Sequence, residues 1–551
     1  MKDINSKTTT FIKAYRSFLR DEGTMPIDQI VRLYKQMSPA LHKYADSSDI
    51  DIQALVYATL RLPKSIPEIC DIFMAQIGES FVREGLKIEL WDEVAAPARR
   101  RKMYFDGKDK LAVFINSVTD LDDMIGLLSA YEIEWNKIHH KLRLFSSEIN
   151  QDSLEKVREF LEINPDDWNR IIRVWTIDAD AILKKIKANE VHFYARLVRG
   201  NYVDYKKAAQ KWLENIVENT SYKNLKSRPL YFVSSNIHSL VNNMTGWVND
   251  REEALISFLR ENKMLQLLKY WEKIQTGKYP GSRENFLWYI LKKYESINRG
   301  VREEREEFER NLGIDYIEAK HYLDINAQVF SLKDIGKTSL RSKLGIELLD
   351  RVDSEALVLN IDYPLGSGAY MVLSAILQNV SNLKGIYILG KASFLHGSLG
   401  DIGLPNEVFD TSSENKFIFN NAFSKEYFEE FESGSVLTNQ KVVSTKGTLL
   451  HSEDAIREYF LNDYAIIEME DGPYLNAIYE TTHFDRYPKG QTATLLKTPI
   501  DIGIIHYASD TPYTKAITLG TRNLGYEGVE ATYVSSLAIL RRILEMELRG
   551  D

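Results

Sequence analysis

Five short apolar runs constrain the fold of this 551-residue chain more than any other feature. All five lie after about residue 320, each is bounded by turn or polar residues, and helical patterns separate them. Apolar runs of this length predict β-strands: AQVFSL, EALVLNI, GIYILG, YAIIEME and DIGIIHYAS. Strands that alternate with helices predict an α/β domain with a parallel or mixed central sheet over residues 320–551.

The first half of the chain has a different pattern, in which helices dominate. Leu154, Val157 and Leu161 repeat at spacings of three and four, as on a helix with one buried face. We therefore expect a mainly helical domain over residues 1–225 and a helical or mixed segment with a linker over residues 226–319. Two apolar runs, LAVFI from Leu111 and LYFV from Leu230, predict short strands within these regions.

Composition excludes several classes of protein. The chain has 79 acidic and 70 basic side chains, and this acidic excess argues against a nucleic-acid binder while leaving room for a local basic pocket. The single cysteine, Cys70, excludes an intramolecular disulfide. No cluster of His, Cys or carboxylates has the spacing of metal ligands, so no metal is expected. Neither a long apolar run nor a secretory signal is present, so we expect a cytoplasmic protein without a membrane partner.

The residues that follow the predicted strands are candidates for an anion site. In α/β sheets, ligands collect at the carboxyl ends of the strands. Gly366-Ser367-Gly368 follows EALVLNI and opens a helix, whose free amides attract phosphate or another anion. Lys391, just after GIYILG, is placed to face that anion, and Phe394 is placed to line a pocket. The alternatives are a plain strand-to-helix turn and a core phenylalanine.

Carboxylates follow two further strands. Glu468, Met469 and Glu470 end YAIIEME, and alternation sends both glutamates to one side of the strand. Buried acids are costly unless they bind something, and a carboxylate can accept hydrogen bonds from two sugar hydroxyls. Ser509-Asp510 ends DIGIIHYAS, where an aspartate in a dry cleft can donate a proton near neutral pH. The alternative for Ser509 and Asp510 is helix capping.

Together these motifs resemble the family I nucleoside phosphorylases and nucleosidases, most closely the AMP nucleosidase catalytic domain, over about residues 320–547. The resemblance rests on the glycine turn, on Glu-Met-Glu and on Ser-Asp-x-Pro with Pro512. It also uses Gly390, Leu395, Gly400 and Asp401 in the second strand and its loop, and Thr438 before a strand. The fold it implies is a three-layer α/β domain with a mixed central sheet, preceded here by the helical region.

The resemblance also implies a reaction, which is cleavage of the N-glycosidic bond of a purine nucleoside or nucleotide by water or phosphate. Asp510 would be the general acid, Glu470 would bind the ribose hydroxyls and Met469 would pack on the sugar. The other binding residues implied are Glu468, Gly366, Ser367, Gly368, Lys391, Phe394, Thr438 and Ser509. No cofactor is implied beyond phosphate as co-substrate or effector. A homo-oligomer with a regulatory or assembly role for the helical half is also implied.

Departures from the family pattern keep a second hypothesis open. KASFLHG, from Lys391 to Gly397, replaces the usual glycine-rich stretch, and the arginine expected after the Thr438 strand is missing. The alternative is a catalytically silent nucleotide-sensing or scaffold protein that retains the domain. Two features of the first half are also open. The basic cluster from Arg99 to Lys102 is either solvated or a phosphate contact, and the polar stretch 234–246 is either a second pocket or a capped helix start.

Overall fold

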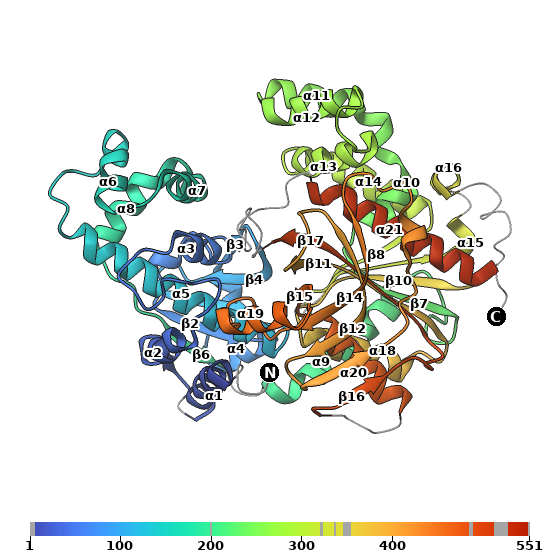
Figure 1. Ribbon diagram of the computed structural model, residues 1–551, viewed down its shortest axis with the longest axis horizontal. Helices are drawn as coiled ribbons and strands as arrows, with labels where there is room; N and C mark the ends of the chain where they lie inside the picture. The colour runs from blue at the N-terminus through green and yellow to red at the C-terminus, as the bar shows by residue number, and fades with distance from the viewer. Residues whose placement is uncertain are drawn as a thin grey trace.

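The computed structural model describes residues 6–21, 23–198, 201–319, 323–335, 338–344, 354–483, 489–511 and 527–548. These residues form two α/β domains side by side, with a group of helices projecting from the second (Figure 1). Within these ranges, no helix is both long and apolar enough to cross a membrane.

The first domain is built on a six-stranded sheet, so the expected mainly helical N-terminal region is not confirmed. The order of strands is β1 (Met25–Pro26), β6 (Tyr194–Leu197), β2 (Asp71–Ala75), β5 (Lys110–Phe114), β4 (Arg99–Phe105) and β3 (Asp92–Ala96). Its helices are α1 (Ser6–Asp21), α2 (Asp28–Met37), α3 (Ile52–Thr59), α4 (Gly78–Arg83), α5 (Val118–Leu142), α6 (Leu154–Phe160), α7 (Pro165–Trp175) and α8 (Ala179–Ala188). Strand β5 is the predicted LAVFI run. Strand β4 escaped prediction because RRRKMYF begins with four charges.

The second domain contains all five predicted strands in an eleven-stranded mixed sheet. The strands in order are β16 (Thr492–Thr494), β13 (Asn415–Ile418), β12 (Ile402–Asp410), β14 (Val436–Ser444), β15 (Ile466–Glu468), β11 (Leu383–Phe394), β7 (Leu230–Ser235), β10 (Leu357–Asp362), β9 (Ala327–Ser331) and β8 (Asp315–Ile317), with β17 (Asp501–Asp510) pairing both β11 and β12. Strands β11, β17, β12, β14 and β15 therefore close into a ring. Strand β7, the predicted LYFV run, lies in the middle of this sheet, which consequently begins well before residue 320.

Helices cover both faces of the large sheet, which gives three layers. One layer is α9 (Asn201–Asn219), α18 (Gly368–Asn379) and α20 (Asp471–Thr482), and the other includes α10 (Ser239–Thr245) and α21 (Glu527–Leu548). The remaining helices are α11 (Glu252–Glu261), α12 (Leu265–Gln275), α13 (Arg283–Glu295), α14 (Arg299–Asn311), α15 (Leu332–Ile335), α16 (Leu340–Leu344) and α19 (Glu453–Leu461). Helices α11, α12 and α13 share an aromatic core around Trp271, Phe286 and Trp288, and they stand at the top of Figure 1.

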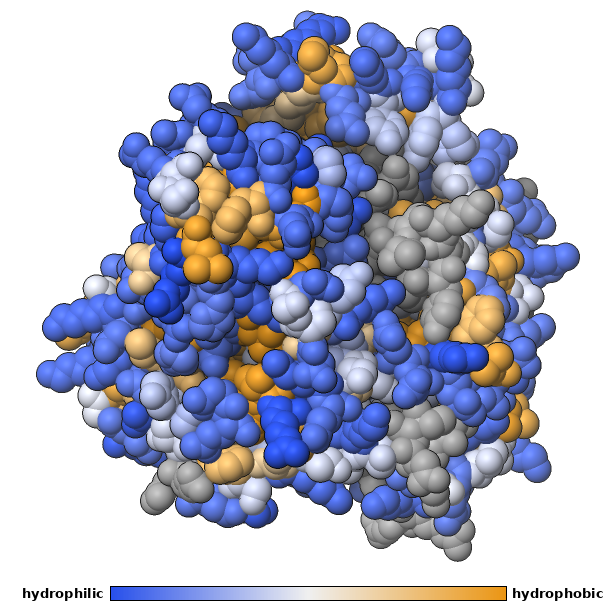
Figure 2. Space-filling view, turned by 60° about the vertical axis from the view of Figure 1, so that its left-hand side comes forward, coloured by the Kyte–Doolittle hydropathy of each residue, from blue (hydrophilic) through white to orange (hydrophobic). Residues whose placement is uncertain are grey.

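The two domains share a packed interface. Leu449 and Leu450 of the second domain belong to the hydrophobic core of the first, where Leu449 packs against Gly126 of α5. Helix α19 follows this contact and lies between the domains (Figure 1). On the outer surface, hydrophilic residues cover most of the face shown in Figure 2, and hydrophobic residues form separate patches. The interface orients the first domain toward the strand ends where the sequence predicts function.

Candidate functional site

The glycine turn is closed by protein groups, so the predicted free amides at Gly366-Ser367-Gly368 are wrong. The Gly366 amide donates to Glu470 Oε1 at 2.9 Å, and the Ser367 amide donates to Thr119 Oγ1 at 2.9 Å. The Gly368 amide bonds to the Leu365 carbonyl in the turn itself. Thr119 belongs to the first turn of α5 in the first domain and touches the turn so closely that a Cβ on Gly366 would lie 2.5 Å from its hydroxyl.

Glu470 lies between the end of β15 and the start of α20. Its Oε1 atom holds the Gly366 amide, and its side chain is half-buried. Burial raises the pKa of Glu470 to about 7, with the Asp471 charge adding to the effect. Met469, beside it, is also half-buried, and the Thr448 hydroxyl lies 3.8 Å from its sulfur atom. Both side chains therefore remain partly accessible at the predicted strand end.

Glu468 has a structural role that the sequence did not predict. It is buried, and its Oε2 atom accepts the backbone amides of Glu470 and Asp471, which caps α20. Asp471 in turn accepts a hydrogen bond of 2.7 Å from His506 Nε2. Burial opposes protonation of His506, but Asp471 raises its pKa above the usual value. The predicted contact of Glu468 with substrate is therefore replaced by a buried network.

Two groups of described residues have the composition of metal sites. Glu468, Asp471 and His506 each offer one atom within 4.8 Å of the others, as do His139, His140 and Glu190. In the first group, Asp471 Oδ2 bonds to His506 Nε2 and Glu468 Oε2 accepts backbone amides, whereas Glu468 Oε1, Asp471 Oδ1 and His506 Nδ1 are buried without a hydrogen-bond partner among the described residues.

Asp510 and Ser509 end β17, next to β11. The Ser509 hydroxyl donates to Asp510 Oδ2 at 2.8 Å, and both residues are half-buried. Across the two strands, Lys391 pairs with Tyr507 and Ser393 pairs with Asp510. Because paired residues and residues two apart share a face of a sheet, Lys391 and Asp510 project to the same side. The structure thus brings these two predicted residues together.

The first domain completes this region with α3. Tyr57 interacts with Thr448 and lies within electrostatic range of Asp510. Burial raises the pKa of Tyr57 to about 12. The Arg61 guanidinium stacks over the Tyr57 ring, 3.6 Å from its centroid, and it also lies within electrostatic range of Lys391. We call the region between these residues, Glu470 and Asp510 the interdomain site.

Arg100 of β4 links the same region to the end of β10. It forms an ion pair with Asp362 across the domain interface. Its neighbours Arg99 and Arg101 have side chains only 5% and 11% exposed, beside Asp120, so the basic cluster is not simply solvated. Tyr363 interacts with both Arg100 and Glu470, and Lys391 interacts with both Arg100 and Asp510. Glu470 and Asp510 therefore both lie within electrostatic range of side chains that also interact with Arg100.

Two predicted residues are not brought to the interdomain site. Phe394 is fully buried in the core at the end of β11, where it packs against Gly403, so its predicted pocket role is wrong. Thr438 is exposed near the start of β14, whereas Ser444 at the end of that strand pairs with Glu468. The two positions are about 20 Å apart along the strand, which excludes shared contact with one ribose.

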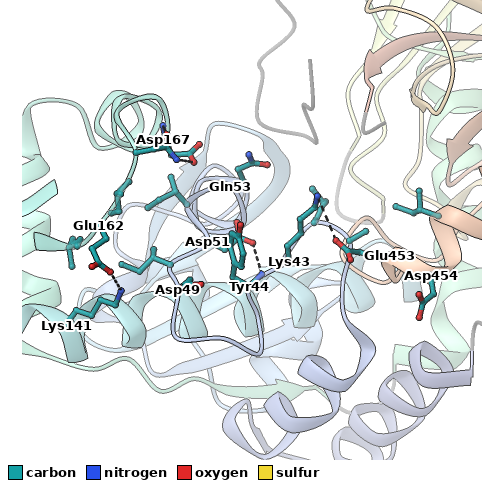
Figure 3. A pocket seen from close by; sticks show the side chains of 18 of the residues that line it. Lys43, Tyr44, Asp49, Asp51, Gln53, Lys141, Glu162, Asp167, Glu453 and Asp454 are labelled. Carbon is teal, nitrogen blue, oxygen red and sulfur yellow. Dashed lines mark hydrogen bonds and ion pairs between the residues drawn. The ribbon is translucent and has the colours of Figure 1, made fainter. Parts of the chain in front are cut away.

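A well-formed pocket lies elsewhere, between the first domain and α19. Its volume is about 880 Å³, and none of the predicted site residues lines it. Figure 3 shows Lys43 facing Glu453 and Lys141 facing Glu162 at this cavity. Six acidic and three basic side chains line it: Asp49, Asp51, Glu162, Asp167, Glu453, Asp454, Lys43, Lys141 and Arg457. We call this cavity the acidic groove. Its charge disfavours an anionic ligand.

Sequence reasoning missed the contribution of the first domain. Tyr57, Arg61 and Thr119 lie in helical segments whose pattern carries no functional signal, whereas the cluster RRRK gave a signal for Arg100. The polar stretch 234–246 is used internally, since Ser235 bonds to Asn360 and Asn242 bonds to Tyr533. His238 is the exposed residue of that stretch, and it lies within electrostatic range of Lys292, Arg100 and Arg305.

Comparisons with known proteins place the chain in a family. A model described as a family of unknown function, DUF6909, matches residues 27–545. The chain belongs to this family. No curated protein matches it. The DUF6909 chain is similar to solved nucleosidases over part of its length.

Three solved structures illustrate that similarity. AMP nucleosidase from Bacteroides thetaiotaomicron is 11% identical, with 63% of this chain and 99% of that chain covered and a TM-score of 0.30. The 5′-methylthioadenosine/S-adenosylhomocysteine nucleosidase from Campylobacter jejuni is 10% identical, with 42% and 90% covered and a TM-score of 0.29. The corresponding nucleosidase from Neisseria meningitidis is 14% identical, with 43% and 94% covered and a TM-score of 0.28. These low values do not identify an activity.

Proposed function

We propose that this DUF6909 protein cleaves the N-glycosidic bond of a purine nucleoside or nucleotide at the interdomain site. One observation carries the proposal. Two partly accessible carboxylates from the ends of different strands, Glu470 and Asp510, lie within electrostatic range of Tyr363 and Lys391, and both of these interact with Arg100. Two carboxyl groups near a sugar match the two needs of this reaction, which are control of the sugar and protonation of the leaving base.

Asp510 acts as the general acid. Cleavage of the bond passes through an oxocarbenium-like sugar while negative charge develops on the departing purine. A proton delivered to N7 neutralises that charge as the C–N bond breaks, and such a transfer contributes typically about 10² to 10⁴-fold. The Ser509 hydroxyl, which donates to Asp510 Oδ2, holds the carboxyl group in place.

Glu470 binds the ribose hydroxyls. When it is ionised, its carboxylate accepts hydrogen bonds from the 2′ and 3′ hydroxyl groups. The Gly366 amide fixes its Oε1 atom, so the orientation of the carboxylate is set before substrate binds. Met469, held beside Thr448, packs on the face of the sugar. Water or phosphate then attacks the anomeric carbon, and no other co-reactant is needed.

The test is release of free base. The full chain is incubated with adenosine, adenosine 5′-monophosphate, methylthioadenosine and the matching guanosine compounds, each with and without inorganic phosphate, and free base is measured by chromatography. The expected result is free purine from at least one compound. Dependence on phosphate then distinguishes a phosphorylase from a hydrolase. If no compound releases base at micromolar enzyme, the proposal is wrong, and nucleotide binding without cleavage would favour the silent sensor instead.

A further inference from the structure

We propose that His139, His140 and Glu190 form a binding site for a divalent transition-metal ion in the first domain. The two histidines lie in the last turn of α5, and Glu190 lies between α8 and β6. Each of the three residues offers one ligand atom within 4.8 Å of the other two. Thr119 lies in the first turn of α5, so the site and the glycine turn are about 30 Å apart along this helix. The inference is therefore independent of the proposed function.

A hydrogen bond to His139 determines which of its ring nitrogens can bind a metal. Its Nδ1 atom lies 2.7 Å from the carbonyl oxygen of Ile186, and a carbonyl can only accept, so Nδ1 carries the proton. The lone pair of the neutral ring is therefore on Nε2, which lies 3.9 Å from Glu190 Oε1. Histidines that bind metals usually donate their other ring N–H in this way, because the bond fixes the tautomer and the orientation of the ring.

His140 reaches the same carboxylate oxygen with its other type of ring nitrogen. Neighbouring side chains on a helix point about 100° apart, but His140 uses Nδ1, near the backbone, and His139 uses the more distant Nε2. His140 Nδ1 lies 3.5 Å from Glu190 Oε1. Separations of 3.5 and 3.9 Å are long for hydrogen bonds. Two atoms bound to one tetrahedral Zn²⁺ lie roughly 3.4 Å apart, so an ion fits here with shifts of about half an ångström or less.

The backbone on both sides of Glu190 is held to α5 by three hydrogen bonds. The Trp135 indole donates to the Asn189 carbonyl at 2.9 Å. The Asn136 side chain donates to the Val191 carbonyl and accepts the Val191 amide, both at 2.9 Å. These bonds fix the position of Glu190 relative to the histidines of the same helix before an ion binds, which is the preorganisation that a metal site requires.

The local charges favour a cation at this point. In the part of the chain that the structure describes, the ion-pair contacts of Glu190 are with histidines alone. His192 Nε2 lies 3.2 Å from Glu190 Oε2, so this ring holds the second oxygen while Oε1 faces the other two rings. The site also lies at the C-terminal end of α5, where the helix dipole attracts positive charge.

The types of ligand favour Zn²⁺ and similar ions over Mg²⁺ and Ca²⁺. Two imidazoles and one carboxylate suit Zn²⁺, Ni²⁺ or Cu²⁺, whereas Mg²⁺ and Ca²⁺ prefer oxygen ligands alone. The side chains of His140 and Glu190 are 61% and 35% exposed, so an ion can enter from solvent and water can complete its coordination. The spacing of ligands along the sequence did not predict the site, because Glu190 is distant in the chain from the two histidines.

Calorimetry with Zn²⁺ and Mg²⁺ tests the site in the full chain, prepared without a histidine tag and stripped of metal with a chelator. The test variants are His140→Gln and Glu190→Gln, whose side chains are partly exposed and whose folding is checked by circular dichroism. The matched control is His483→Gln, an exposed histidine at the end of α20. We expect one Zn²⁺ per chain with a Kd of about 1 μM or tighter, and binding of Mg²⁺ at least about a hundredfold weaker.

Each test variant should weaken Zn²⁺ binding at least about tenfold, and the control should stay within about twofold of wild type. The site is wrong if wild type binds Zn²⁺ no more tightly than about 100 μM or binds Mg²⁺ equally well. It is also wrong if His140→Gln and Glu190→Gln keep the affinity of wild type, or if His483→Gln weakens binding as much as they do. None of these outcomes depends on release of free base, so the metal site and the proposed reaction are tested separately.

Discussion

The acidic groove and the interdomain site are two candidate ligand sites, and they differ in how their charged side chains are paired. The groove is a cavity of about 880 Å³, but its lysines are paired with glutamates and its carboxylates are in excess. Over the residues that the structure describes, Lys391 of the interdomain site has no ion-pair partner, and it shares a face of the sheet with Asp510. If the proposed function holds, unpaired charge rather than cavity volume indicates where this molecule binds its ligand.

The test with the largest expected effect makes the same aspartate-to-asparagine substitution in each of the two regions. Asp510→Asn removes the proposed proton donor and is expected to lower turnover at least about a hundredfold. Asp454→Asn makes the same change in the acidic groove and is expected to leave turnover unchanged. Base release is measured for both, and circular dichroism confirms that both fold. Equal turnover in the two variants would remove Asp510 from the reaction.

The next largest expected effect is on stability, at the contact of Gly366 with Thr119 between the two domains. Gly366 has φ of +51°, and an added Cβ would meet the Thr119 hydroxyl at 2.5 Å. Gly366→Ala is therefore expected to lower the free energy of unfolding by about 1–3 kcal/mol, from overpacking and backbone strain together. Denaturant titration measures it. Gly85→Ala, at φ of +79° with open space around it, isolates the backbone part. An equal loss in both variants would mean that Thr119 does not press on the turn.

The pH dependence sharpens the role of Glu470. Its pKa of about 7 lies above the ordinary value of 4.5, so the ionised form that accepts the ribose hydroxyls gains population as pH rises through 7. We expect kcat/KM to increase about tenfold from pH 6 to pH 8, because that quantity follows ionisations of the free enzyme. Glu470→Gln should abolish this rise in kcat/KM. It should also weaken the binding of ribosides more than the binding of free bases. If Glu470→Gln keeps the same dependence of kcat/KM on pH, the ionisation belongs to another group.

The sequence predicted the elements whose signal is local. Five strands of the second domain, and the positions of Glu470 and Asp510 after two of them, follow from apolar runs and the polar residues that end them. The closed glycine turn was not predictable in this way, because the group that closes it, Thr119, comes from a different domain. The Gly-Ser-Gly motif predicts a turn with backbone amides, but it does not predict that a side chain from another domain will hydrogen-bond to one of them.

The fold of the first domain was also missed because local sequence patterns do not show contacts between distant residues. Its sheet includes β4, whose alternating pattern begins with arginines that look like solvated surface. Two of these, Arg99 and Arg101, have side chains only 5% and 11% exposed beside Asp120, and the third, Arg100, pairs with Asp362 of the other domain. The charged residues of β4 suggested a solvent-exposed segment, whereas in the fold they form ion pairs with residues distant in sequence.

The smallest expected effect completes the comparison from the side of the acidic groove. Lys43 and Glu453 are 3.9 Å apart, and each is about half exposed, at 54% and 55%. Exposed pairs of this kind contribute little because water and salt screen them, so Lys43→Gln should change the free energy of unfolding by less than about 0.5 kcal/mol. It should also leave nucleotide affinity unchanged, while Lys391→Gln weakens it. If Lys43→Gln reduced nucleotide affinity as much as Lys391→Gln, the groove would share the ligand, and unsatisfied charge would no longer distinguish the two regions.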